Sequence, residues 1–159
     1  MNGAAAMNNA PHLSMAQADG AEALLEMRFV ARPDRLKLIR GSIRSSALMC
    51  GFDDEAAQNI VLAIDEACQN IIVHGYGRGV EGAVILSLFR HNGGILVHLR
   101  DFAKPVDPSK VQPRDLTDIR PGKLGSHFIR SIMDTVEFRT TSNSKGNLLE
   151  MTKRLGQPL

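Results

Sequence analysis

The sequence is short of aromatic residues and carries almost no excess of charge. Its 159 residues include no Trp, one Tyr and six Phe, so we expect an aliphatic core and no row of aromatic platforms for nucleic acid bases. Lys and Arg number 19 and Asp and Glu number 17, for a net charge of +2, which is too small an imbalance to indicate a nucleic acid-binding surface. No stretch approaches the roughly 18 apolar residues that span a membrane. The sequence therefore predicts no direct binding to nucleic acid and no insertion in a membrane.

Cysteine is also scarce, and no targeting signal is visible. Cys50 and Cys68 lie among aliphatic residues, so we interpret them as buried, reduced thiols in preference to a disulfide or a metal-binding pair. Residues 1–20 lack the basic start and the continuous apolar core of a signal peptide. We therefore expect a cytoplasmic protein in which residues 1–20 are a flexible leader and residues 21–159 form one domain.

What the sequence does contain is a series of regular hydrophobic patterns. Apolar and polar residues alternate at 23–31, which predicts a strand, and apolar residues recur every three or four positions at 33–50 and from 53 to about 74, which predicts two amphipathic helices. Runs at 80–89 and 95–100 predict a hairpin, and runs at 135–141 and 148–155 predict a second one after a helix at 124–133. The proline-containing stretch 103–122 has the length of a functional loop. This order predicts an α+β fold, a two-layer sandwich with helices on one face of one sheet.

Basic residues recur along the first predicted helix. They are Arg32, Arg35, Lys37, Arg40 and Arg44. A solvated helix face and a docking surface for an acidic partner both agree with this pattern, and the sequence leaves both open.

A carboxylate and an amide lie one turn apart on the second predicted helix. Glu66 and Asn70 fall together on the side away from its apolar stripe. Glu66 can accept a proton or orient a hydroxyl group, and the side-chain oxygen of Asn70 can bind a hard cation such as Mg²⁺. A solvated helix face would show the same spacing, so the pair alone leaves both interpretations open.

Three further features follow this pair along the chain. Asp101 ends a predicted strand, where its acceptor oxygens would point into an adjoining cavity. The proline-containing stretch after it has the position of a lid. The tetrapeptide Gly122-Lys123-Leu124-Gly125 opens a helix, whose free N–H groups and dipole favour a phosphate. Together with the acid–amide pair, these features predict a site for a magnesium nucleotide.

In residue type and in order, these motifs resemble those of the anti-sigma factor serine/threonine kinases. That family belongs to the superfamily of ATP-binding domains shared by gyrase, histidine kinases and mismatch-repair ATPases. The resemblance covers about residues 25–155 and rests on these motifs: Glu66-x-x-x-Asn70, Ile72-Val73-His74-Gly75-Tyr76, Asp101 with Pro105 to Pro108, Gly122-x-Leu124-Gly125, and Ile129-Arg130-x-Ile132-Met133-Asp134. It implies a histidine kinase-like ATPase domain of the Bergerat type, in which helices cover one mostly antiparallel mixed sheet.

The resemblance also implies a role for each matching residue. Glu66 matches the general base that helps deprotonate a protein Ser or Thr hydroxyl, and Asn70 matches the Mg²⁺ ligand that bridges the phosphates of ATP. Asp101 matches the acid that hydrogen-bonds the adenine amino group. Gly122 and Gly125 match the loop that cradles the phosphates. The full set implied to bind the nucleotide is Asn70, Asp101, Ala103, Gly122, Lys123, Leu124 and Gly125.

Two positions depart from the family pattern. Ala103 stands where the family usually has a glycine after its adenine-binding strand, and its methyl group would crowd backbone close to the base. Lys123 replaces a common small residue, and contact with a phosphate and a solvated first-turn lysine agree equally well with its position. Both changes bear on ATP affinity more than on the fold, since Glu66 and Asn70 are kept.

The leading hypothesis is a bacterial regulatory kinase, whose partners are those that the resemblance implies. Such a protein binds ATP and Mg²⁺, sequesters a sigma factor or a comparable regulator, and phosphorylates Ser or Thr of an anti-sigma factor antagonist protein. Family members commonly act as dimers, so a homodimer is also implied, although no sequence feature defines its interface. The alternative is a protein-binding module of the same fold, with nucleotide binding weakened through Ala103 and no kinase activity.

Overall fold

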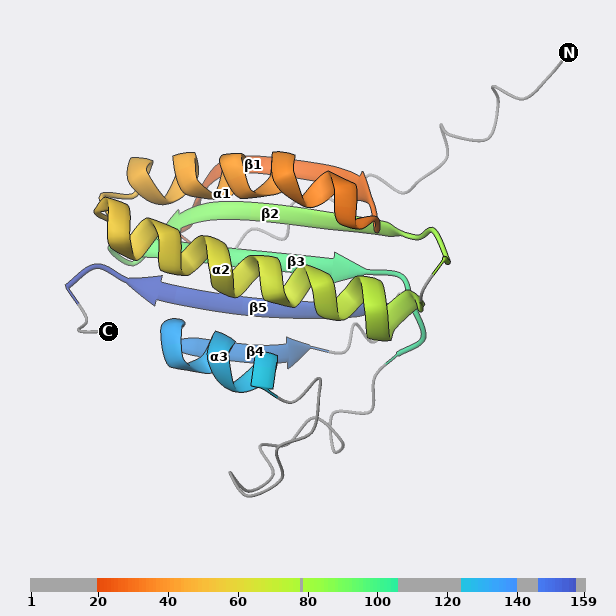
Figure 1. The fold of residues 1–159 in the computed structure, drawn as a ribbon. Coiled ribbons are helices and arrows are strands. Elements are labelled where there is room, and N and C mark those ends of the chain that lie inside the picture. Colours follow the sequence, from red (N-terminus) through yellow and green to blue (C-terminus); the bar gives the residue numbers. More distant parts are fainter. Residues whose placement is uncertain (1–19, 78, 106–123, 140–145, 157–159) are drawn as a thin grey trace, which may run out of the picture.

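The structure, a computed structural model, describes residues 20–77, 79–105, 124–139 and 146–156, in which helices and strands follow the predicted order (Figure 1). The elements are β1 (Glu22–Val30), the 3₁₀-helix η1 (Pro33–Arg35), α1 (Leu36–Met49), α2 (Asp54–Asn70), the π-helix η2 (Ile71–Tyr76), β2 (Ala83–His91), β3 (Gly94–Asp101), α3 (Leu124–Ile132), β4 (Thr135–Arg139) and β5 (Asn147–Arg154). Most of the predicted leader and of the proline-containing stretch lies outside the described residues. No helix in the described ranges is long and apolar enough to cross a bilayer.

One sheet of five strands forms the lower layer of the sandwich, in the order β1-β2-β3-β5-β4. Every pairing among these described strands is antiparallel, so the mostly antiparallel sheet that was expected contains no parallel pair here. Figure 1 shows α1, α2 and α3 on the same face of this sheet. The predicted α+β two-layer sandwich is therefore confirmed.

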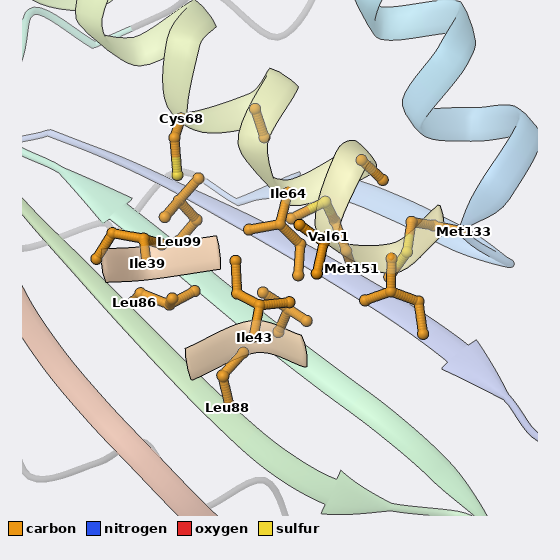
Figure 2. Packing of buried hydrophobic residues seen from close by; sticks show 14 of the residues in the cluster. Ile39, Ile43, Val61, Ile64, Cys68, Leu86, Leu88, Leu99, Met133 and Met151 are labelled. Atoms are coloured by element: carbon orange, nitrogen blue, oxygen red, sulfur yellow. The ribbon is translucent and has the colours of Figure 1, made fainter. Parts of the chain in front are cut away.

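The space between the helices and the sheet is filled by aliphatic side chains, as the lack of aromatic residues predicted. Figure 2 labels buried residues from the helices, the strands and the turn after α3: Ile39, Ile43, Val61, Ile64, Cys68, Leu86, Leu88, Leu99, Met133 and Met151. Complete burial of one such aliphatic side chain stabilises the fold by about 1.5–3 kcal/mol. Both cysteines are free and buried, as predicted, and burial raises the pKa of Cys68 to about 12.

The helix that carries the acid–amide pair begins at a strong cap and changes its geometry at its end. The side chain of Asp53 accepts a hydrogen bond of 2.8 Å from the N–H of Ala56, and Asp54 and Glu55 place negative charge in the first turn. After Asn70 the chain continues as the π-helix η2. The single helix predicted to about residue 74 is thus α2 followed by wider turns, a geometry that is rare and frequent at functional sites.

Three of the basic residues in and before η1 and α1, Arg32, Arg40 and Arg44, are engaged by acids of the same chain. Arg40 donates two hydrogen bonds to Asp65, of 2.7 and 3.0 Å, and Arg44 forms an ion pair with Asp54. Arg32 is paired with two further acids. These arginines are about half exposed, so this part of the molecule presents a solvated face whose charges are largely balanced within the chain.

Candidate functional site

The predicted site residues that the structure describes come from elements that meet at one edge of the sandwich. In Figure 1 the C-terminal end of α2, the end of β3 and the start of β5 lie on the same side of the molecule. The helix α3 packs against α2 there, with its first turn toward this edge. Four parts of the sequence, namely α2 with η2, β3, α3 and β5, therefore contribute to one place.

Glu66 and Asn70 are both half-buried near the end of α2. A Cβ atom added to Gly125 would lie 1.8 Å from Oε1 of Glu66, so the first turn of α3 lies directly against this carboxylate. Any side chain at position 125 would have to displace it. The pair is therefore not a fully solvated helix face, and the structure brings together Glu66 and Gly125 from two separate sequence motifs.

Asp65, next to Glu66, ties α2 to α1. It is 7% exposed. One carboxylate oxygen accepts from Nε of Arg40, and the other accepts from Nη2 of Arg40 and, at 2.8 Å, from Nε2 of Gln69. Both of its oxygens are thus satisfied by the fold, whereas the carboxylate of Glu66 lies on the side of α3.

Asp101 ends β3 and is 5% exposed. Its Oδ1 accepts two hydrogen bonds of 2.9 Å, from the N–H of Ala103 and from Nδ2 of Asn147. Burial raises the pKa of Asp101 because the charged form loses hydration, and the hydrogen bonds from Asn147 and Ala103 and the charge of Arg100 oppose this effect without cancelling it. Within the described part of the chain no group donates to Oδ2. One oxygen of this buried carboxylate therefore has no donor among the residues that the structure describes.

The two residues that follow Asp101, Phe102 and Ala103, contact the π-helix η2. The N–H of Phe102 donates to the hydroxyl oxygen of Tyr76 at 2.8 Å, and that hydroxyl donates to the carbonyl of Ala83 at 2.7 Å. Ala103 is 8% exposed, and its methyl group lies 3.6 Å from where a Cβ atom of Gly75 would be. The methyl group that departs from the family pattern thus packs beside a glycine of η2.

Sequence reasoning missed two residues of this arrangement. Tyr76 was part of a motif but had no role, and Asn147 fell in the stretch 142–147 that separates the two runs of the second predicted hairpin. The one available signal for Asn147 was the glycine before it. Of the remaining predicted residues, Gly122 and Lys123 lie outside the described residues, and Leu124 is described only as the start of the α3 backbone.

The chemistry of these groups fits ATP with Mg²⁺. The open acceptor on Asp101 suits an amino group, and the amide of Asn70 offers one neutral oxygen. Mg²⁺ usually takes only one or two protein ligands and completes its shell with substrate phosphates and water. Among the described residues no cluster of three or more His, Cys, Asp or Glu side chains could hold a metal ion.

The fold and the edge site together define an α+β sandwich with an acid–amide pair on its central helix. The chain belongs to the histidine kinase-like ATPase domain family, whose profile matches residues 29–153.

Curated relatives place it more closely within that family. It is 28% identical over 141 residues to a serine-protein kinase RsbW of Halalkalibacterium halodurans, an alignment that covers 82% of this chain and 83% of the relative. It is 26% identical over 144 residues to the serine-protein kinase RsbW of Bacillus pumilus, covering 84% and 87% of the two chains. The anti-sigma F factor of a Thermoanaerobacter species is 26% identical over 137 residues, covering 84% of this chain and 94% of the relative. The predicted membership of the anti-sigma factor kinase family, and with it the class of serine/threonine protein kinase, is confirmed.

Proposed function

We propose that this protein is an anti-sigma regulatory factor that binds ATP with Mg²⁺ and phosphorylates Ser or Thr of an anti-sigma factor antagonist protein, while it sequesters a sigma factor or a similar regulator. The observation that carries the proposal is the buried carboxylate of Asp101, which is held through Oδ1 and open at Oδ2 beside the end of α2. Phosphoryl transfer depends mostly on positioning and charge neutralisation. A domain with few reactive groups is suited to that chemistry.

Each site residue has one task in this proposal. Glu66 accepts the proton of the substrate hydroxyl, and its contact with Gly125 limits where its carboxylate can lie. Asn70 holds Mg²⁺, which supplies positive charge at the phosphates. Asp101 accepts the adenine amino group, and Ala103 fixes the turn after it.

The phosphate-binding part of the proposal rests on residues 122–125. Gly122, Lys123, Leu124 and Gly125 supply backbone N–H groups for the phosphates at the start of α3. The described part of α3 begins at Leu124, and its first turn includes Gly125.

The partners and the setting are likewise proposed. The printed names of the relatives, serine-protein kinase and anti-sigma F factor, support a sigma factor and an antagonist protein as partners. We include in the proposal a leader at residues 1–20, an ATPase domain at residues 21–159, a homodimer, and action in the cytoplasm.

A labelling experiment tests the kinase. The full chain is incubated with Mg²⁺, ATP labelled at the γ-phosphate and the antagonist protein of the same organism, and Glu66→Gln is expected to lower the transfer rate at least about 100-fold. Glu55→Gln is the matched control, since it removes the same charge from the exposed first turn of the same helix. Absence of transfer by the wild type, or equal rates for Glu66→Gln and the control, contradicts the proposal.

A second candidate is a protein-binding module without kinase activity, and Ala103 is the observation that favours it. This residue is buried where the family usually has a glycine, so its methyl group occupies space close to the proposed position of the adenine ring. Calorimetry with Mg²⁺ and ATP separates the two candidates. Absence of binding up to millimolar nucleotide, with restoration in Ala103→Gly, would favour the module.

A further inference from the structure

The turn that follows β3 is held by two side chains from other parts of the chain. The hydroxyl oxygen of Tyr76, at the end of η2, accepts a hydrogen bond of 2.8 Å from the N–H of Phe102. Asn147, the first residue of β5, donates from Nδ2 to Oδ1 of Asp101 at 2.9 Å and to the carbonyl of Lys104 at 3.2 Å. Residues 101–104 are thus fixed at three points by groups outside their own strand.

Two glycines make this arrangement possible. A Cβ atom on Gly82 would lie 2.0 Å from Cε1 of Tyr76, so the phenol ring occupies the space that a side chain would take. Gly146 has φ +105 and a Cβ atom there would lie 2.0 Å from the carbonyl oxygen of Asp101. The backbone before Asn147 can therefore approach the end of β3 only at a glycine, and this approach places the amide of Asn147 against the carboxylate.

These contacts fix the orientation of the Asp101 carboxylate. A carboxylate accepts hydrogen bonds at both oxygens, but here the two described donors, the N–H of Ala103 and Nδ2 of Asn147, both go to Oδ1. Rotation of the carboxylate would break both bonds. Oδ2 is consequently held in one direction although no described group binds it.

We propose that Asn147 and Tyr76 are positioning residues that make Oδ2 of Asp101 a fixed acceptor for an exocyclic amino group, so that they set the preference for adenine over a purine with a carbonyl oxygen at that place. This inference rests on the proposed function, because it assumes that Asp101 meets the base. It adds to that function two residues that do not touch the nucleotide. Removal of either one loosens the carboxylate and lowers the discrimination between bases, since a buried acceptor discriminates only while it is held in place.

The test compares two nucleotides that differ at one group. Calorimetry measures the affinity of the full chain, with Mg²⁺, for ATP and for inosine triphosphate, which carries a carbonyl oxygen in place of the adenine amino group. Asn147→Ala is expected to weaken ATP binding about tenfold and to leave inosine triphosphate almost unaffected, so that the ratio of the two affinities falls. Tyr76→Phe keeps the ring beside Gly82 and loses only the hydroxyl, and it should lower the same ratio by a smaller factor.

Thr152→Ala serves as the matched control. Thr152 also lies on β5 and its hydroxyl contacts that of Thr135 at 2.6 Å, so the variant weakens the same strand at another place and should keep the wild-type ratio. A wild-type ratio in both Asn147→Ala and Tyr76→Phe overturns the inference, and so does an equal loss of both nucleotides. If one variant fails to fold, the other decides. Absence of ATP binding by the wild type itself is a different result, which would refute the proposed function.

Discussion

The two buried aspartates among the described residues stand in opposite environments. Asp65 is 7% exposed and Asp101 is 5% exposed, so both lose nearly all contact with water. Asp65 receives a two-point ion pair from Arg40 and a hydrogen bond from Gln69, which use both of its oxygens. Asp101 receives neutral donors on one oxygen, and burial raises its pKa. The acid that holds two helices together is compensated by the fold, whereas the acid that we propose to bind the nucleotide has described donors on one oxygen only.

The sharpest way to break this comparison is to neutralise Asp101. In Asp101→Asn the side-chain oxygen can still accept from Ala103 and Asn147, and an NH₂ group then stands where Oδ2 was. That group faces the adenine amino group donor to donor, so we expect ATP affinity to fall at least about 100-fold, or about 3 kcal/mol, and inosine triphosphate to bind better than ATP. Calorimetry with both nucleotides measures this.

The same variant should fold at least as well as the wild type. Because the pKa of Asp101 is raised in the folded state, the folded state favours the neutral form, which asparagine imitates. Urea unfolding at neutral pH should therefore give an equal or higher free energy of unfolding. A marked loss of stability together with unchanged base preference would mean that Asp101 is structural.

Removal of the Asp65 carboxylate should lower the stability of the fold and leave the preference for ATP over inosine triphosphate unchanged. Asp65→Ala leaves the guanidinium of Arg40 without its partner and should lower the free energy of unfolding by about 2 kcal/mol, at the low end for a broken buried pair because Arg40 is 48% exposed. Thermal unfolding would then shift down by about 6 °C. The ratio of ATP to inosine triphosphate affinity should stay at the wild-type value, and a change in that ratio larger than the change in stability would contradict the comparison.

The sequence predicted the part of this contrast that depends on local patterns. The stripe of α2, the cap at Asp53 and the position of Asp101 at a strand end follow from spacing and turn residues a few positions apart. The contacts that decide the role of Asp101 do not. Phe102 meets Tyr76 across 26 residues and Asp101 meets Asn147 across 46, and side-chain contacts at that separation leave no period in a sequence. The π-helix also escaped prediction, because its residues continue the helical pattern of α2.

Glu66 follows Asp65 on α2, and Gly125 tests whether the position of the Glu66 carboxylate matters. A methyl group at position 125 would collide with Oε1 of Glu66, so in Gly125→Ala the carboxylate must move. We expect the rate of phosphoryl transfer at saturating ATP to fall about tenfold, which corresponds to about 1.4 kcal/mol, with a smaller change in ATP affinity. His127→Ala, on the exposed side of the same helix, is the control, and equal rates in both variants would show that the contact is incidental.

The smallest expected effect is a dependence on pH that belongs to Asp101 alone. Protonation puts a hydrogen on the carboxyl group and removes the acceptor, so ATP affinity should decline by about two- to threefold as the pH falls toward the raised pKa of Asp101, earlier than for an exposed aspartate. The linked effect on folding has the other sign. The stability that this group contributes is present below its ordinary pKa and is lost as the pH rises through the raised value.

In Asn147→Ala this loss of ATP affinity at low pH, the acid limb of the pH profile, should begin closer to neutral pH. The hydrogen bond from Asn147 lowers the pKa of Asp101, so its removal lets burial raise that pKa more, while Thr152→Ala should leave the limb in place. Calorimetric titrations of ATP across a series of pH values, with Asp101→Asn as the variant that cannot titrate, measure the limb directly. An acid limb that persists in Asp101→Asn would belong to another group, and the contrast between the two buried aspartates would then rest on geometry alone.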